Sequence, residues 1–131
     1  MKIRMRIDCI LPGLMCLPAI GHAGPECQVD RFLGATSPQG AIAHMRVINN
    51  GGKCSVRNLG VPSDRKNPAD TGKILRLAAH GTAEFVAPRA SYKPDSGYVG
   101  DDEFEYEAFA RSRDNRPLRL RVLVKVSVLS T

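Results

Sequence analysis

The 131-residue sequence contains no tryptophan and few other aromatic residues, with three tyrosines and four phenylalanines. A core without tryptophan has to be filled mostly by valine, leucine, isoleucine and alanine. Histidine is equally scarce, at three residues, and no serine or cysteine lies in a sequence context typical of a catalytic triad. The composition predicts a small aliphatic domain, and we expect it not to be an enzyme and to carry no cofactor or metal.

Long apolar runs are missing as well, apart from a short one near the N-terminus. Three basic residues precede an apolar run over residues 9–20, which is shorter than the roughly 20 residues needed to cross a bilayer. Residues 21–23 place glycine and alanine where signal peptidase accepts small side chains. We therefore predict a signal peptide over residues 1–23, cleaved after Ala23, and a periplasmic or secreted protein without a membrane span.

A large charge of one sign is also lacking in the predicted mature chain. Removing residues 1–23 takes away three basic residues and one aspartate, so the formal net charge falls from +6 to +4. With few aromatic residues for stacking and a charge this modest, the chain is not expected to bind nucleic acid. The remaining 108 residues fit one domain with a single core.

Four cysteines occur, and two of them leave with the predicted signal peptide. Cys27 and Cys54 remain. An even pair of cysteines in a small exported domain is typical of a disulfide, because the compartment is oxidising. We predict that Cys27 and Cys54 are joined.

Helical spacing of apolar residues is absent from the rest of the chain, and apolar and polar residues alternate instead. Residues 28–34 predict a short first strand, and residues 41–48 a second, with alanine, methionine and valine on one parity. Because Asn49 and the three residues after it tolerate positive φ, we expect the second strand to form a hairpin with residues 53–59. Residues 60–72 contain prolines and charges without periodicity, which predicts a long surface loop.

The second half of the chain alternates more regularly. The pattern predicts strands over residues 73–79, 82–87, 90–92, 103–110 and 118–128. The charged parity of the last two carries Glu103, Glu105, Glu107, Arg119, Arg121 and Lys125. Such alternation is what an antiparallel pair half-buried on a core requires, and we expect cross-strand ion pairs rather than catalytic carboxylates. About seven strands with turns every 8–12 residues predict an all-β fold, an immunoglobulin-like antiparallel β-sandwich over residues 24–131.

One segment carries a family resemblance. It runs Tyr92-Lys93-Pro94-Asp95-Ser96-Gly97-Tyr98-Val99-Gly100-Asp101-Asp102-Glu103-Phe104-Glu105-Tyr106, after His80-Gly81-Thr82 and a strand, and before the valine-rich last strand. Residues 73–128 thereby resemble the bacterial immunoglobulin-like or cadherin-like domains of secreted and cell-surface proteins, which often occur in tandem. The resemblance implies that Tyr92 ends a core strand, that Phe104 and Tyr106 fill the core, and that Gly97, Tyr98 and Gly100 shape a crossover. This chain departs from the pattern in holding one copy and in its acidic glutamate face, and the motif indicates a fold more than an activity.

Acidic residues around this crossover leave calcium binding open. Carboxylates are offered by Asp95, Asp101, Asp102 and Glu103, and oxygen is the ligand atom that Ca²⁺ prefers. Cadherin-like repeats sometimes place such sites between domains, whereas a single domain lacks the neighbour that would complete the coordination shell. The other interpretation is that Asp101 and Asp102 cap the turn and face solvent.

Two functions from different classes are compatible with these residues. We favour an exported noncatalytic binding or structural module of the cell envelope. The alternative is a small periplasmic metal or ligand carrier using His44, Met45 and the Cys27/Cys54 pair. The carrier is less favoured, because neither cysteine lies in a Cys-x-x-Cys motif and no methionine-rich or histidine-rich tract accompanies them.

Basic residues bracket the predicted loop. They are Arg57, Arg65, Lys66, Lys73 and Arg76. Only Asp64 and Asp70 lie close to them in sequence, so positive charge is expected to be unbalanced there. Because rigid sandwiches carry their binding residues on loops, we expect this end to bind an acidic partner, either an envelope or extracellular protein or an anionic glycan.

Overall fold

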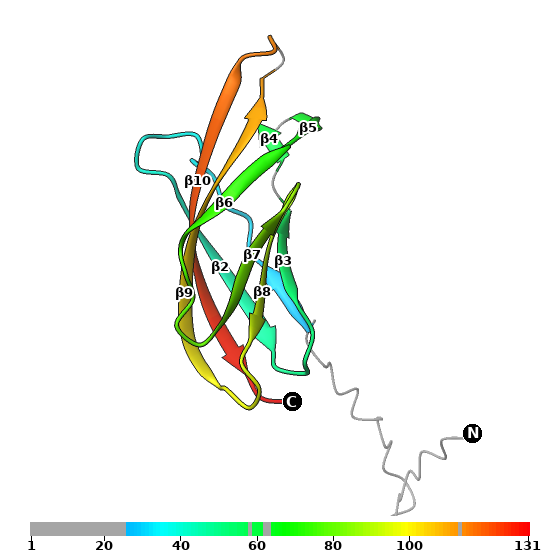
Figure 1. The fold of residues 1–131 in the computed structure, drawn as a ribbon, viewed down its shortest axis with the longest axis vertical. Helices are drawn as coiled ribbons and strands as arrows, with labels where there is room; N and C mark the ends of the chain where they lie inside the picture. The colour runs from blue at the N-terminus through cyan, green and yellow to red at the C-terminus, as the bar shows by residue number, and fades with distance from the viewer. Residues whose placement is uncertain (1–25, 58, 62–63, 113) are drawn as a thin grey trace, which may run out of the picture.

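The computed structural model describes residues 26–57, 59–61, 64–112 and 114–131, and between residues 57 and 68 it describes the backbone. This part of the chain forms ten strands and no helix (Figure 1). It therefore contains no helix long and apolar enough to cross a membrane. The predicted signal peptide over residues 1–23 and its cleavage after Ala23 lie outside the described residues.

The strands form two main sheets (Figure 1). The larger sheet has the order β1 (Cys27–Val29), β2 (Ala41–Ile48), β10 (Pro117–Leu129), β9 (Gly100–Arg111) and β6 (Thr71–Arg76). The smaller sheet has the order β3 (Cys54–Arg57), β8 (Arg89–Pro94) and β7 (Gly81–Val86). A separate hairpin joins β4 (Leu59–Val61) to β5 (Asp64–Pro68). The larger sheet is mixed, because β2 runs parallel to β10 while its other strand pairs are antiparallel.

The core is built by the parity that the sequence predicts. Along β9 and β10 one set of alternate residues is buried: Phe104, Tyr106, Ala108, Ala110, Leu120, Val122, Val124, Val126 and Val128. Tyr92 of β8 meets them from the smaller sheet, with its ring centroid 5.8 Å from that of Phe104. The ring of Phe104 in turn lies 6.2 Å from that of Tyr106. Phe104 and Tyr106 fill the core as the resemblance implies. Tyr92 is also a core residue, but it lies two positions before the end of β8 at Pro94.

The hairpin predicted for residues 41–48 and 53–59 is wrong. β2 has the predicted bounds and its alanine, methionine and valine parity is buried, but its backbone pairs with β1 and β10. β3 pairs with β8 in the other sheet. The link between β2 and β3 therefore crosses from one sheet to the other. The residues of the turn cannot reveal this, because the strand that pairs with β2 in place of β3 is β10, from the far end of the chain.

The long loop predicted for residues 60–72 is also wrong. β4 and β5 form an irregular two-stranded hairpin there, with Leu59 opposite Pro68 and Val61 opposite Asp64, and β6 already begins at Thr71. The pairing of backbone groups defines this hairpin. It leaves no alternation of apolar and polar residues in the sequence, which is the signal on which strand prediction depends.

Candidate binding surfaces

The crossover between β8 and β9 is an ordered piece of structure. Gly97 and Gly100 adopt φ angles of +77° and +142°, which side-chain-bearing residues rarely adopt. The ring of Tyr98 stacks on that of His80, with centroids 4.2 Å apart and planes 8° apart. The amide of Asn49 donates to the carbonyl oxygens of Asp95 and Tyr98 at 2.8 and 2.9 Å. These contacts give His80 and the glycine-tyrosine motif a structural role in shaping the turn.

Hydrogen bonds to Asp102 connect several segments at the same end of the molecule. Its carboxylate accepts the Tyr92 hydroxyl at 2.8 Å and the backbone amides of Ala79, His80 and Glu103 at 2.9–3.0 Å. Burial acts to raise the pKa of Asp102, but the hydrogen bonds, led by that from Tyr92, outweigh it and lower the pKa below its ordinary value. Burial, followed by the bond to Asp102, raises the pKa of Tyr92. The pair is stable as a carboxylate and a neutral phenol.

The lowered pKa of Asp102 predicts a loss of stability in acid. Because the folded protein holds this carboxyl ionised more strongly than the unfolded chain does, its contribution is present above the unfolded pKa of about 4 and is lost as the pH falls through the folded value. Asp102→Asn should therefore lower the free energy of unfolding at neutral pH and make its decline toward acid shallower. Urea unfolding over a pH series measures this. Asp101→Asn is the matched control, and an equal effect there would contradict the assignment.

The candidate calcium ligands are not gathered into a cage. Asp102 is occupied by the four hydrogen bonds above, and Glu103 lies 3.3 Å from a guanidinium nitrogen of Arg76. Among the described residues, no group of three or more histidine, cysteine, aspartate or glutamate side chains is arranged to hold a metal ion. The expected capping role suits Asp102, although its side chain is half-buried rather than facing solvent.

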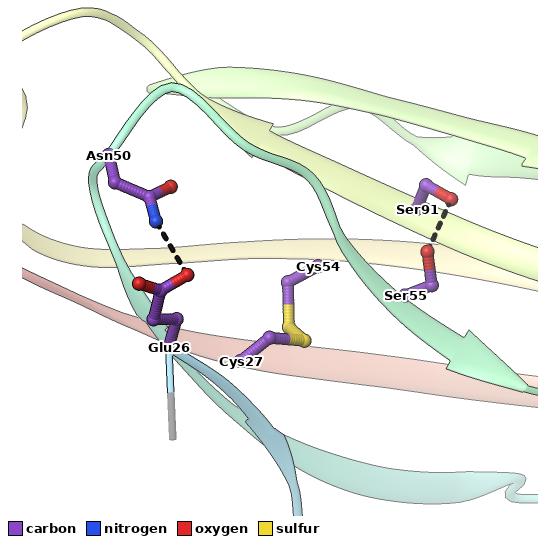
Figure 2. The surroundings of a disulfide bond; sticks show 6 residues. All are labelled: Glu26, Cys27, Asn50, Cys54, Ser55 and Ser91. Atoms are coloured by element: carbon purple, nitrogen blue, oxygen red, sulfur yellow. Dashed lines mark hydrogen bonds between the residues drawn. A yellow bond between two sulfur atoms is a disulfide. The ribbon is translucent and has the colours of Figure 1, made fainter. Parts of the chain in front are cut away.

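Cys27 and Cys54 form the predicted disulfide (Figure 2). Their Cα atoms are 5.3 Å apart, and because Cys27 lies on β1 and Cys54 on β3, the bond joins the two sheets. Figure 2 shows hydrogen bonds on either side of it, between Asn50 and Glu26 at 2.8 Å and between the hydroxyls of Ser55 and Ser91 at 2.9 Å. The disulfide therefore closes one side of the two-sheet structure.

The residues of the carrier hypothesis are not brought together as a site. The sulfurs of Cys27 and Cys54 are bonded to each other, so neither is a thiolate. Met45 is buried in the core, whereas His44 next to it is exposed on the opposite face of β2. Neighbouring residues on a strand point to opposite faces, which separates the imidazole from the thioether.

The outer face of the larger sheet carries the predicted ion pairs. Glu107 accepts a hydrogen bond from Nε of Arg119, and Glu105 accepts one from Nε of Arg121, each at 2.8 Å. Both pairs are diagonal, because Arg121 is the residue directly opposite Glu107. The bond from Arg119, helped by the charge of Lys73 and opposed by burial, lowers the pKa of Glu107, which is only 7% exposed. These carboxylates are engaged in holding β9 to its neighbours.

Two of the five predicted partner-binding residues belong to this network. Nζ of Lys73 lies 3.5 Å from Glu107, and Arg76 pairs with Glu103. The expectation that Lys73 and Arg76 lack acidic neighbours is therefore wrong, because β6 pairs with β9 and meets glutamates distant in sequence. A second consequence is that Lys125, directly opposite Glu103, forms no ion pair with a described residue.

The other three predicted partner-binding residues lie on two strands. Arg57 is the last residue of β3, and Arg65 and Lys66 lie on β5. Strand pairing places Arg57 directly opposite Arg89, whose side chain is exposed. Like charges directly opposite each other are unfavourable, so this position gains from an anion. Arg89 was not among the residues predicted from sequence, because only the pairing of β3 with β8 reveals it.

A second polar feature is an open groove of about 530 Å³ on the outer face of the larger sheet. Its lining includes Asp30, His44, Arg46, Asp101, Lys125 and Ser127. Arg46 and Lys125 form no ion pair with any residue that the structure describes, and aspartates flank them. Because charges of both signs line the groove, it offers no uniform attraction for an anion or a cation.

No protein-family model matches the chain, and no curated protein matches it. The resemblance of residues 73–128 to bacterial immunoglobulin-like or cadherin-like domains therefore rests on the residues that carry it. Beyond that resemblance, the chain is an all-β protein of two sheets with a disulfide between them.

Proposed function

We propose that the chain is an exported, noncatalytic binding module of the cell envelope with an immunoglobulin-like sandwich fold. The disulfide supports export, because such bonds persist in oxidising compartments and are rare in the cytosol. The engagement of Glu105, Glu107 and Asp102 in structural contacts supports a noncatalytic role. The carboxylates that could serve as general acids or bases in a catalytic site contribute to the stability of the sheets instead.

The immunoglobulin-like assignment is supported by the order of the longer strands. In the constant-type arrangement seven strands divide four to three between two sheets. Without β1 and the β4–β5 hairpin, the strands here also divide four to three, as β2-β10-β9-β6 and β3-β8-β7. The difference is that the first of these strands lies beside the last, in parallel. We infer a variant in which the first strand has changed sheets.

The surface that we propose for binding is the basic end formed by Arg57, Arg65, Lys66 and Arg89. The observation that carries this proposal is the pairing of Arg57 with Arg89, which sets two positive charges on neighbouring strands. β4 begins at Leu59, two positions after Arg57 in the sequence, and leads into β5 with its two further basic residues. The partner should be acidic, either an envelope protein or an anionic glycan, and its binding should weaken as salt rises.

Charge reversal at the basic end tests this proposal. We expect the double variant Arg65→Glu/Lys66→Glu of residues 24–131 to lose most of its binding to heparin, a defined anionic glycan, while its melting temperature stays nearly unchanged. Isothermal titration calorimetry at low and physiological ionic strength provides the measurement. Lys93→Glu is the matched control, because Lys93 is an exposed lysine on β8 that forms no ion pair among the described residues.

The competing surface is tested in the same titration. Reversal of Arg119 and Arg121 on the outer face of the larger sheet should weaken heparin binding less than reversal of Arg65 and Lys66. A larger loss at Arg119 and Arg121, with the fold intact by circular dichroism, would place the interface on the other surface and contradict the proposal.

A further inference from the structure

The two sheets end in four edge strands, and three of them are protected against pairing with another chain. β1 has only three residues. β3 is cross-linked to β1 through the disulfide. β6 carries Lys73 and Arg76 and has a register shift between Ile74 and Arg76. Short length, basic residues and bulges are the usual means by which proteins prevent edge-to-edge association.

The fourth edge strand, β7, lacks these protections, and its one charged residue, Glu84, is paired with Lys53 of the same chain. It spans six residues, Gly-Thr-Ala-Glu-Phe-Val, without lysine, arginine, proline or a register shift. Among the described strands, only β8 pairs with it. Val86 at its end is largely exposed. β7 therefore presents a regular row of backbone groups to an incoming strand.

The alternation of hydrogen bonds shows which residues face this free edge. The amide of Asp95 donates to the carbonyl oxygen of His80 at 2.9 Å. These two residues continue the register of β7 and β8 by one position beyond the pair formed by Gly81 and Pro94. In an antiparallel ladder, bonded and non-bonded pairs alternate, so the residues of even number, Thr82 among them, bond to β8. The backbone groups of Gly81, Ala83 and Phe85 then point away from the sheet. Pro94 lies opposite Gly81 and has no amide hydrogen to donate, which agrees with a pair that forms no backbone hydrogen bonds at this position.

We propose that two copies of this chain associate through β7, paired antiparallel about a two-fold axis at Ala83. This register places Ala83 opposite Ala83 of the second copy, so that outward-pointing backbone groups meet each other on both strands. The two three-stranded sheets become one continuous six-stranded sheet. A two-fold axis makes the contact self-limiting, because each copy uses its single unprotected edge.

The side chains in this register are self-complementary. On the core side, Gly81 of the second copy lies opposite Phe85 and, having no side chain, leaves room for the Phe85 ring, which packs toward Tyr106 of its own chain. On the outer side, Thr82 lies opposite Glu84 of the second copy. This match favours a second copy over an unrelated strand.

Two substitutions of opposite charge at Thr82 test the register. Each dimer contains two Thr82–Glu84 pairs, so Thr82→Glu puts like charges opposite each other twice, whereas Thr82→Lys puts opposite charges there. With each cross-strand pair worth a few tenths to about 1 kcal/mol, the dissociation constants of the two variants should differ on the order of tenfold. Sedimentation velocity over a concentration series of residues 24–131 measures them, and circular dichroism verifies that the fold is intact. Because Thr82 lies opposite Lys93 on β8 of its own chain, Thr82→Glu should give the more stable monomer, which is the reverse of the order expected for the dimers.

Hydrogen exchange adds a readout that nonspecific association would not give. The amides of Ala83 and Phe85 should gain protection as protein concentration rises, while those of Thr82 and Glu84, already bonded to β8, should change little. A chain that stays monomeric at high concentration would overturn the proposal. A dimer whose affinity ignores the sign of the charge at residue 82, or whose added protection lies outside β7, would overturn it equally.

Discussion

Cys27→Ser is expected to lower the free energy of unfolding by roughly 3 kcal/mol, because the disulfide closes a loop between residues 27 apart in sequence and restricts the unfolded chain. A domain of this size has only about 5–15 kcal/mol of stability in total. The loss should appear as a melting temperature lower by more than about 10 °C. Urea unfolding and thermal circular dichroism of oxidised wild type and variant provide the measurement.

The choice of cysteine isolates the effect of the bond. Cys27 is exposed, whereas Cys54 is fully buried. Cys27→Ser leaves a buried thiol, which behaves as a small apolar group, while Cys54→Ser also buries a hydroxyl in the core and should cost about 1–3 kcal/mol more. Wild type reduced with dithiothreitol should match Cys27→Ser. If the reduced protein were as stable as the oxidised one, the disulfide would not hold the sheets together as we conclude.

Phe104→Ala is expected to cost about 3–5 kcal/mol. Its ring is fully buried between those of Tyr92 and Tyr106, so its loss leaves a cavity that two stacked aromatic rings cannot easily fill. Phe109→Ala is the matched control, because Phe109 lies on the same strand but is 38% exposed on the opposite face. Denaturant unfolding should show a much smaller loss for the control. Equal losses would contradict the assignment of the two faces of β9.

The parts of the fold that the sequence predicted correctly share one property, which is that their pattern is repeated over many residues. β9 and β10 are 12 and 13 residues long and alternate between apolar and polar residues over most of their length, and a slip by one position would expose the whole apolar set. The β2 bounds and its buried parity were predicted for the same reason. The disulfide could be predicted because only two cysteines follow the predicted signal peptide, and two cysteines allow a single pairing.

The parts that were predicted wrongly depend on partners far away in sequence. Asn49 and the glycines after it suggested a hairpin, yet β10 takes the place beside β2, and the link between β2 and β3 crosses to the other sheet. The β4–β5 hairpin has no alternation to reveal it. In the binding surface, Lys73 and Arg76 appeared free because the glutamates that pair with them come from β9. Arg89 was missed because only the register of β3 with β8 places it opposite Arg57.

The most direct test of the proposed function is to map where an acidic ligand binds. Titration of ¹⁵N-labelled residues 24–131 with a short heparin oligosaccharide, followed by amide chemical shifts, gives a residue-by-residue answer. We expect the shifts to concentrate at Arg57, at Arg65 and Lys66 on β5, and at Arg89, and to shrink as salt is added. Shifts confined to Arg46 and Lys125 in the groove of the larger sheet, or no shifts at low salt, would contradict it.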